Sequence, residues 1–235
     1  MVKYEHIIKA VEDYLRKCTV TLKEIRSHIS GLVESIATTQ EDVEPLIDAI
    51  THFYRDTYNK PKEYLVVRDY NGNEWFNESD DVYNAVEVPD EAYEEGQRNG
   101  LLFSIHNHPD GSAFPSPDDC AINVEQNEEY SIIVGKREIT ITKQDTNPDD
   151  VYIVDDVNRR HYFKHFNNMR ETNYDGIRDV TDKISSGNIP VDDGQKMLNK
   201  KINKYVKENM GEMVNDLNKM YKGNGVDITV SYVQW

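Results

Sequence analysis

Cysteine is almost missing from this chain, which has only Cys18 and Cys120 among 235 residues. Two cysteines without a C-x-x-C spacing exclude a disulfide framework, so we expect a reduced protein in the cytoplasm. The first residues lack the apolar core of a signal peptide, and no apolar run approaches the roughly 20 residues of a membrane span. We therefore expect an intracellular chain without a membrane partner, with association with a virion as an alternative.

Basic residues are also scarce, because 27 Lys and Arg stand against 43 Asp and Glu and give a net charge of -16. A chain this acidic repels phosphate backbones, which argues against nucleic acid as a partner. Residues 74–95 contain nine acidic residues and no Lys or Arg. This stretch is most simply a solvated acidic surface, and it would also attract a basic protein or peptide substrate.

The spacing of hydrophobic residues divides the chain into three regions. We expect an N-terminal helical region over residues 1–58, an α/β catalytic domain over 59–155, and a C-terminal helical extension with a terminal strand over 156–235. The expected helices are 7–18, 21–36, 38–54, 90–97, 116–125, 176–184 and 192–221, and the expected strands are 63–69, 74–76, 82–88, 101–106, 130–134, 138–142, 151–154 and 226–235. Asn71-Gly72 predicts a type I′ hairpin turn, and the terminal strand either closes the sheet or docks on a partner by strand addition.

The segment SIHNHPDGSAFPSPDDC, residues 104–120, carries the chemistry. Side chains two apart on a strand share a face, so His106 and His108 point the same way. A helix that begins near Ser116 returns Asp119 towards them. Two imidazoles, one carboxylate and one open position describe a catalytic zinc site, in which the metal lowers the pKa of its water to about 7. A lone H-x-H pair is a weak signal, but the S-x-x-D spacing that follows strengthens it.

This segment resembles the metal-binding motif of the JAMM/MPN+ family of zinc isopeptidases and peptidases. It matches the motif at His106, His108, Pro109, Ser116 and Asp119 without a gap. The resemblance implies a mixed sheet flanked by helices, of the MPN (cytidine-deaminase-like) fold. It also implies Zn²⁺ held by the two histidines and Asp119, with Ser116 donating a hydrogen bond to the oxyanion. The simpler role for Ser116 is a helix N-cap, and the two roles are compatible.

The family also uses a glutamate as general base, upstream of the motif and before an apolar strand. Pro61-Lys62-Glu63 followed by apolar residues 64–67 fits that description, so Glu63 is the candidate base. Glu44 is the second candidate, although it lies near a helix start. Glu34 and Glu74 fit less well.

Three other features bear on metal binding. His161 and His165 are four residues apart and would share a helix face, but no third ligand is evident, and a polar helix face is the simpler interpretation. No Cys/His cluster follows the motif, which argues against the second structural zinc of some family members. Cys120 follows Asp119 and is most simply a small buried helix residue.

These observations predict a zinc-dependent metallopeptidase that hydrolyses a peptide or isopeptide bond, for instance in a ubiquitin-like conjugate. The long unmatched termini favour an alternative, a structural or assembly protein of a phage-like particle or multi-subunit complex with an embedded JAMM domain. A third interpretation, the RadC-like branch linked to DNA, conflicts with the charge of -16.

Overall fold

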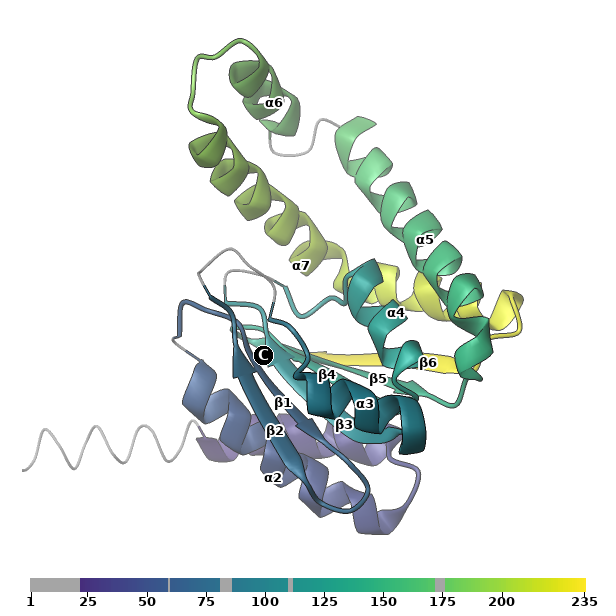
Figure 1. The fold of residues 1–235 in the computed structure, drawn as a ribbon. Helices are drawn as coiled ribbons and strands as arrows, with labels where there is room; N and C mark the ends of the chain where they lie inside the picture. The colour runs from purple at the N-terminus through teal and green to yellow at the C-terminus, as the bar shows by residue number, and fades with distance from the viewer. Residues whose placement is uncertain (1–21, 59, 81–85, 110–111, 172–175) are drawn as a thin grey trace, which may run out of the picture.

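The protein forms a mixed α/β structure around one six-stranded sheet (Figure 1). The computed structural model describes residues 22–58, 60–80, 86–109, 112–171 and 176–235. Residues 22–36 are helical. The elements that follow are α2 (Gln40–Thr57), β1 (Tyr64–Arg68), β2 (Glu74–Glu78), α3 (Asp90–Asn99), β3 (Leu101–Asn107), α4 (Pro117–Glu125), β4 (Glu128–Val134), β5 (Glu138–Gln144), α5 (Val151–Glu171), α6 (Ile177–Ser185), α7 (Val191–Gly223) and β6 (Ile228–Gln234).

The strands lie in the order β2-β1-β3-β4-β5-β6. Only β3 and β4 among these neighbours pair in parallel, and α4 lies between them in the chain, as a parallel crossover requires. The other pairs are antiparallel. β1 pairs with β3 so that Leu65 lies opposite His106, which brings the segment around Glu63 to the end of β3.

One face of the sheet is covered by the first two described helices, residues 22–36 and α2 (Figure 1). Their apolar stripes pack on alternate residues of the central strands, as the two-residue period of a strand dictates. This core contains, among others, Ile29, Ile47, Ile50, Phe103, Ile105, Tyr130, Ile132, Ile139 and Ile141. The N-terminal helices are therefore part of the sheet's main core.

The opposite face carries polar side chains at its centre. Ser104, His106, Ser131 and Thr140 are buried there on β3, β4 and β5. A second core, which joins α4, α5, α7 and β6, lies beside them, and it includes Val124, Val157, Leu217 and Tyr221. Buried polar groups in the middle of a sheet are costly unless they are paired or functional, so this face is where a site is expected.

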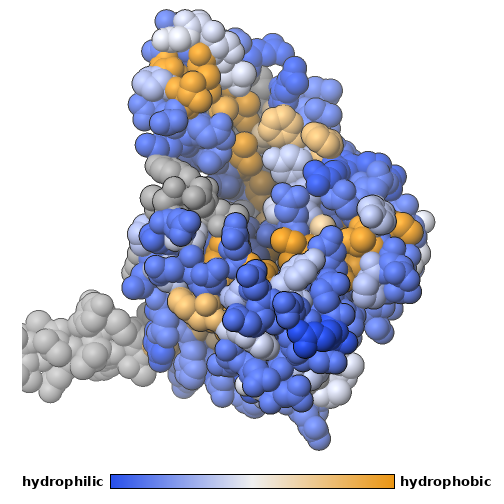
Figure 2. Space-filling view, in the orientation of Figure 1, coloured by the Kyte–Doolittle hydropathy of each residue, from blue (hydrophilic) through white to orange (hydrophobic). Residues whose placement is uncertain are grey.

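Helices α5, α6 and α7 form an arm that extends away from the sheet (Figure 1). The visible face of the molecule is mostly hydrophilic, but hydrophobic residues gather at the outer end of the arm and along its length (Figure 2). At its base the arm returns to the sheet, because α7 leads into β6 and β6 pairs with β5 over seven residues. The terminal segment thus adopts the first of its two expected roles and closes the sheet. Among the described residues, no helix is long and apolar enough to cross a membrane.

The strand expected over 151–154 is wrong, because these residues begin α5. Asn147 caps a short 3₁₀ turn by accepting the Asp149 N–H at 3.0 Å, and this turn runs directly into the helix. Val154 and Val157 are buried three positions apart, which is a helical spacing. The four-residue apolar run was too short to distinguish the two periods.

Three other expected elements differ from the structure or lie wholly or partly outside its described part. A strand was expected over 82–88, but residues 86–88 are not in a strand, and residues 81–85 lie outside the described part. The helix expected over 7–18 also lies outside the described part. The type I′ turn at Asn71-Gly72 is also wrong, because Gly72 (φ 87°) has positive φ and Asn71 does not. The buried carboxylate of Asp69 accepts the N–H groups of Asn71 and Asn73 at 2.9 and 2.8 Å and so holds a wider turn.

Candidate metal centre

The two motif histidines meet at the end of β3. His106 lies within the strand and His108 directly after it, and their Nε2 atoms are 3.1 Å apart. The His108 Nδ1 lies 2.7 Å from the Ser112 carbonyl oxygen. Because a carbonyl only accepts, Nδ1 carries the hydrogen and the Nε2 lone pair is left for a metal ion.

Asp119 is turned towards the histidines by the start of α4. Ser116 is the N-cap and forms a capping box with Asp119. The Ser116 N–H donates to Asp119 Oδ2 at 2.7 Å, and the Asp119 N–H donates to Ser116 Oγ at 3.1 Å. Asp119 Oδ1 lies 3.6 Å from His106 Nε2, and Oδ2 lies 3.9 Å from His108 Nε2. The neighbouring Asp118 is 80% exposed and pairs with Arg159 instead.

The protonation states suit metal binding. Burial lowers the pKa of His106 to about 4, against the opposing effect of Asp119 and with a further lowering from His108. Burial alone would raise the pKa of Asp119, but the two histidines and the Ser116 hydrogen bonds outweigh it and hold that pKa below its usual value. Neutral imidazole and ionised carboxylate are the forms that bind metal ions.

Glu63 faces the same place from the segment before β1. It lines a cavity of about 60 Å³ together with His106 and Asp119. The Val86 N–H donates to Glu63 Oε2 at 3.2 Å. Burial raises the pKa of Glu63, opposed by His108 and that hydrogen bond. A carboxylate with a raised pKa beside a cluster of candidate metal ligands is suited to accept and return a proton.

Asn107 fixes the backbone on both sides of Glu63. Its Oδ1 accepts the Tyr64 N–H at 2.8 Å, and its Nδ2 donates to the Lys62 carbonyl at 3.0 Å. Since Asn107 lies between the two histidines in sequence, one strand end sets the positions of both the histidines and the glutamate. No feature of the sequence assigned this positioning residue in advance.

The other candidate glutamates lie away from this cavity. Glu44 binds Arg26 at 2.7 Å, Glu74 lies 3.4 Å from Arg68, and Glu34 is exposed on the first described helix. Among these candidates, Glu63 is the one that lines the cavity with His106 and Asp119.

The rest of the cavity wall is partly apolar and partly polar, and its apolar part consists of Leu65, Val86, Val88 and Ile122. Its polar part consists of Ser104, Asn123, Gln126 and Glu128. Asn123 Nδ2, Gln126 Nε2 and Glu128 Oε1 are buried without a hydrogen-bond partner, so they are available to a ligand. Burial raises the pKa of Glu128 to about 8, although hydrogen bonds from Ser104 oppose this shift.

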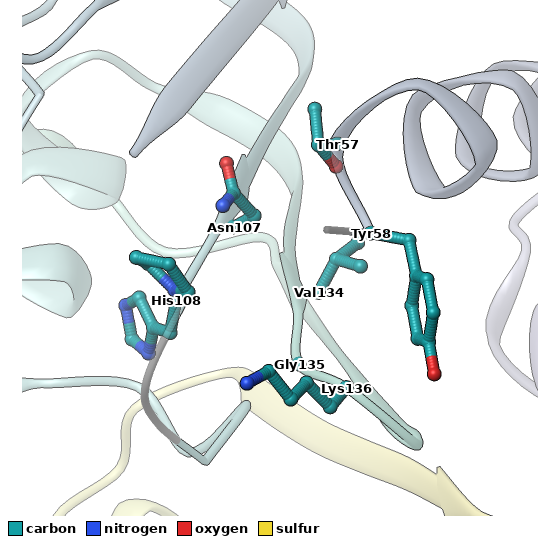
Figure 3. A pocket seen from close by; sticks show the side chains of 8 residues that line it. Thr57, Tyr58, Asn107, His108, Val134, Gly135 and Lys136 are labelled. Atoms are coloured by element: carbon teal, nitrogen blue, oxygen red, sulfur yellow. The ribbon is translucent and has the colours of Figure 1, made fainter. Parts of the chain in front are cut away.

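A smaller hollow of about 10 Å³ lies beside His108 (Figure 3). It is bounded by Thr57 and Tyr58 at the end of α2 and by Gly135 and Lys136 in the β4–β5 turn. Cys120, by contrast, is buried among the helices, where burial raises the pKa of its thiol to about 12 and its hydrogen-bond partner is Tyr221.

The structure also provides the missing third group for the H-x-x-x-H pair. Asp216 of α7 lies beside His161 and His165 of α5, and one ligand atom from each lies within 4.8 Å of the others. The sequence prediction of a polar helix face is wrong for the two histidines, because both are buried.

Comparisons with protein-family models, curated proteins and solved structures find no match for this chain. The geometry of the site is therefore the basis for its proposed function.

Proposed function

We propose that this chain is a zinc-dependent metallopeptidase of the JAMM/MPN+ type, with the MPN fold, and that it hydrolyses a peptide or isopeptide bond. The observation that carries the proposal is one cavity in which Glu63 faces His106 and Asp119. Protein ligands alone describe a structural site, whereas ligands beside an open space and a base describe a catalytic one.

The donor set fits zinc. Two imidazole nitrogens and one carboxylate are a common ligand set for catalytic Zn²⁺, which keeps a fourth position for water. The 3.1 Å between the Nε2 atoms of His106 and His108 approaches the separation of about 3.3 Å between tetrahedral ligands at 2.0–2.1 Å from the ion. The His108–Ser112 hydrogen bond supplies the orientation that metal-binding histidines require.

In this proposal Glu63 is the general base and later the general acid. A Zn²⁺ ion held by the three ligands would lower the pKa of a water molecule and polarise the scissile carbonyl. Glu63 would accept a proton from the attacking water as the water oxygen bonds to the carbonyl carbon, and would give that proton to the amine as the C–N bond breaks. The Ser116 hydroxyl, which accepts the Asp119 N–H, keeps its own hydrogen for the oxyanion.

The substrate would place a polar group in the cavity. Asn123 and Gln126 present N–H donors there, and Glu128 presents a carboxyl oxygen. The acidic composition of residues 74–95 favours a basic protein or peptide, or a ubiquitin-like conjugate.

The test is cleavage of a mixed peptide library that contains lysine-branched peptides with isopeptide bonds, followed by mass spectrometry of new chain ends. The zinc-loaded protein is compared with Glu63→Gln and with Glu74→Gln, a matched variant of an exposed strand glutamate. We expect cleavage by the wild type and Glu74→Gln and its loss in Glu63→Gln. Identical product profiles for the wild type and Glu63→Gln would refute the peptidase proposal.

The exposed hydrophobic residues of the arm favour a second candidate, an assembly protein with an embedded JAMM domain. Tyr152 and Phe163 on α5 and Val191 on α7 are 84%, 57% and 67% exposed, and such residues mark protein interfaces when they gather. Light scattering distinguishes the two candidates. A stable oligomer that Tyr152→Ser and Phe163→Ser together dissolve supports assembly, whereas a monomer that cleaves peptides contradicts it.

A further inference from the structure

The second group of histidines lies at the base of the arm, where α5 packs against α7. His161 and His165 are four residues apart on α5 and so share one helix face. Their exposed fractions are only 1% and 4%. Asp216 of α7 faces both of them. Two buried imidazoles that turn towards one carboxylate are uncommon in a core that could hold apolar residues instead.

We propose that His161, His165 and Asp216 form a second zinc site, which joins α5 to α7 and is structural rather than catalytic. Asp216 Oδ2 lies 3.3 Å from His165 Nε2 and 3.8 Å from His161 Nε2. Tetrahedral ligands at 2.0–2.1 Å from Zn²⁺ lie about 3.3 Å apart, so these donors need to move little. A histidine pair at i and i+4 on a helix is an established geometry for binding one zinc ion.

A fourth potential donor, a backbone carbonyl, lies beside the three side chains. The Met213 carbonyl lies 2.9 Å from His161 Nε2, one turn before Asp216 on α7. Because a carbonyl only accepts, His161 Nε2 carries the hydrogen in the metal-free protein, and zinc binding would move that hydrogen to Nδ1 and free the carbonyl as a fourth donor. Structural zinc sites are closed in this way, whereas catalytic sites keep one position open.

Lys164 competes with the metal ion. Its Nζ lies 2.7 Å from Asp216 Oδ2, the oxygen that also faces both histidines. The Lys164 side chain is 53% exposed, so a metal ion can displace its flexible ammonium end into solvent. Without metal, the same residues form an ion-paired network between the two helices. A Lys164 substitution distinguishes the two states, because it weakens the metal-free ion-pair network but increases the affinity for the metal ion.

The site would also support the first metal centre. The ring of Phe114 stacks on His161 with centroids 5.6 Å apart and an interplanar angle of 16°. Phe114 lies in the segment between His108 and Ser116, so it belongs to the loop that joins the ligands of the first cluster. A metal ion that fixed the His161 ring would also hold Phe114, and with it the loop between His108 and Ser116.

The experiment isolates the second site by removing the first. The full chain with His106→Ala and His108→Ala is loaded with ZnCl₂, freed of loose metal and measured by elemental mass spectrometry and thermal unfolding. We expect about one zinc ion per chain and a rise in the unfolding midpoint of several degrees. Adding Asp216→Asn, which keeps the side-chain shape, should abolish both effects. His52→Ala, an exposed histidine, should change neither.

Lys164→Ala in the same background tests the direction in which the affinity for Zn²⁺ changes. We expect it to lower the Kd for Zn²⁺ by roughly tenfold, as the loss of a competing unit charge permits. A double variant that folds, binds no zinc and shows no zinc-dependent midpoint would overturn the second site. That outcome leaves the proposed peptidase untouched, because the first cluster is tested by cleavage and by Glu63→Gln in the unmodified background.

Discussion

Within the part of the chain that the structure describes, two clusters combine two histidines with one aspartate, and their neighbours differ. In the first cluster, His106 and His108 are two residues apart at a strand end, and a glutamate faces the same cavity. In the second, His161 and His165 are four residues apart on a helix, with a lysine on the shared aspartate and a backbone carbonyl on one imidazole.

The neighbours of the two clusters, rather than their side-chain sets, distinguish what each cluster is proposed to do. A strand end projects its side chains beyond the packed sheet, and the first cluster borders a cavity there. A helix face packed on another helix leaves its side chains enclosed, as the low exposure of both helical histidines shows. A carboxylate beside a metal ion removes protons, whereas an ammonium group beside it only competes with the ion.

The largest effect that separates the clusters is expected from Glu63→Gln. This change keeps the shape of the side chain and removes the proton acceptor, so we expect the cleavage rate to fall by about 10³-fold. The zinc content should stay the same, because Glu63 is not among the three grouped ligands. Peptide cleavage kinetics and elemental mass spectrometry on the same samples measure the two quantities.

The matched change at the second cluster is Lys164→Gln, which removes the neighbouring charge without touching a ligand. It should leave the cleavage rate unchanged. If both substitutions reduced cleavage to the same extent, the assignment of one catalytic and one structural cluster would be wrong.

The first cluster could be predicted because its ligands are local in sequence. His106, His108, Ser116 and Asp119 lie within one strand, one loop and one capping box, and each element has a short-range sequence signal. Most strands and helices around it were predictable for the same reason, since their apolar periods extend over five or more residues.

The second cluster depends on a long-range contact. Asp216 is 51 positions from His165, and no local pattern connects them. Its place is set by the packing of α5 on α7, which a single sequence does not specify. Glu128 and Asn107 were missed for a related reason, because they gain their roles only from the pairing of β3 with β4 and β1.

The acid sensitivity of the second cluster gives the next largest effect. Burial, assisted by His165, lowers the pKa of His161 to about 4, while Met213 and Asp216 oppose this shift and Lys164 adds to it. The unfolded chain, in which the pKa is 6.5, therefore binds a proton at higher pH than the folded chain. In zinc-free protein the free energy of unfolding should fall by about 3 kcal/mol between roughly pH 6.5 and 4 on this account.

Denaturant unfolding at several pH values, with a chelator present, measures this loss. His161→Gln removes the titrating group, so its free energy of unfolding should depend less on pH by that amount. His28→Gln, at an exposed histidine, should match the wild type. An unchanged acid dependence in His161→Gln would show that this imidazole is not held neutral by its surroundings.

The smallest predicted effects concern Ser116, whose two proposed roles have different chemical requirements. Its hydroxyl oxygen caps α4, so Ser116→Ala should lower the free energy of unfolding by about 1 kcal/mol. Its hydroxyl hydrogen is proposed to stabilise the oxyanion, and loss of one such donor slows cleavage by about 10²-fold.

Ser116→Gly separates the roles, because glycine at an N-cap costs only a few tenths of a kcal/mol but has no hydroxyl. We expect Ser116→Gly to fold almost normally and cleave about as slowly as Ser116→Ala, and Ser116→Thr to restore both properties. A Gly variant with the full cleavage rate would assign Ser116 to the helix alone, and the oxyanion would then depend on the metal centre.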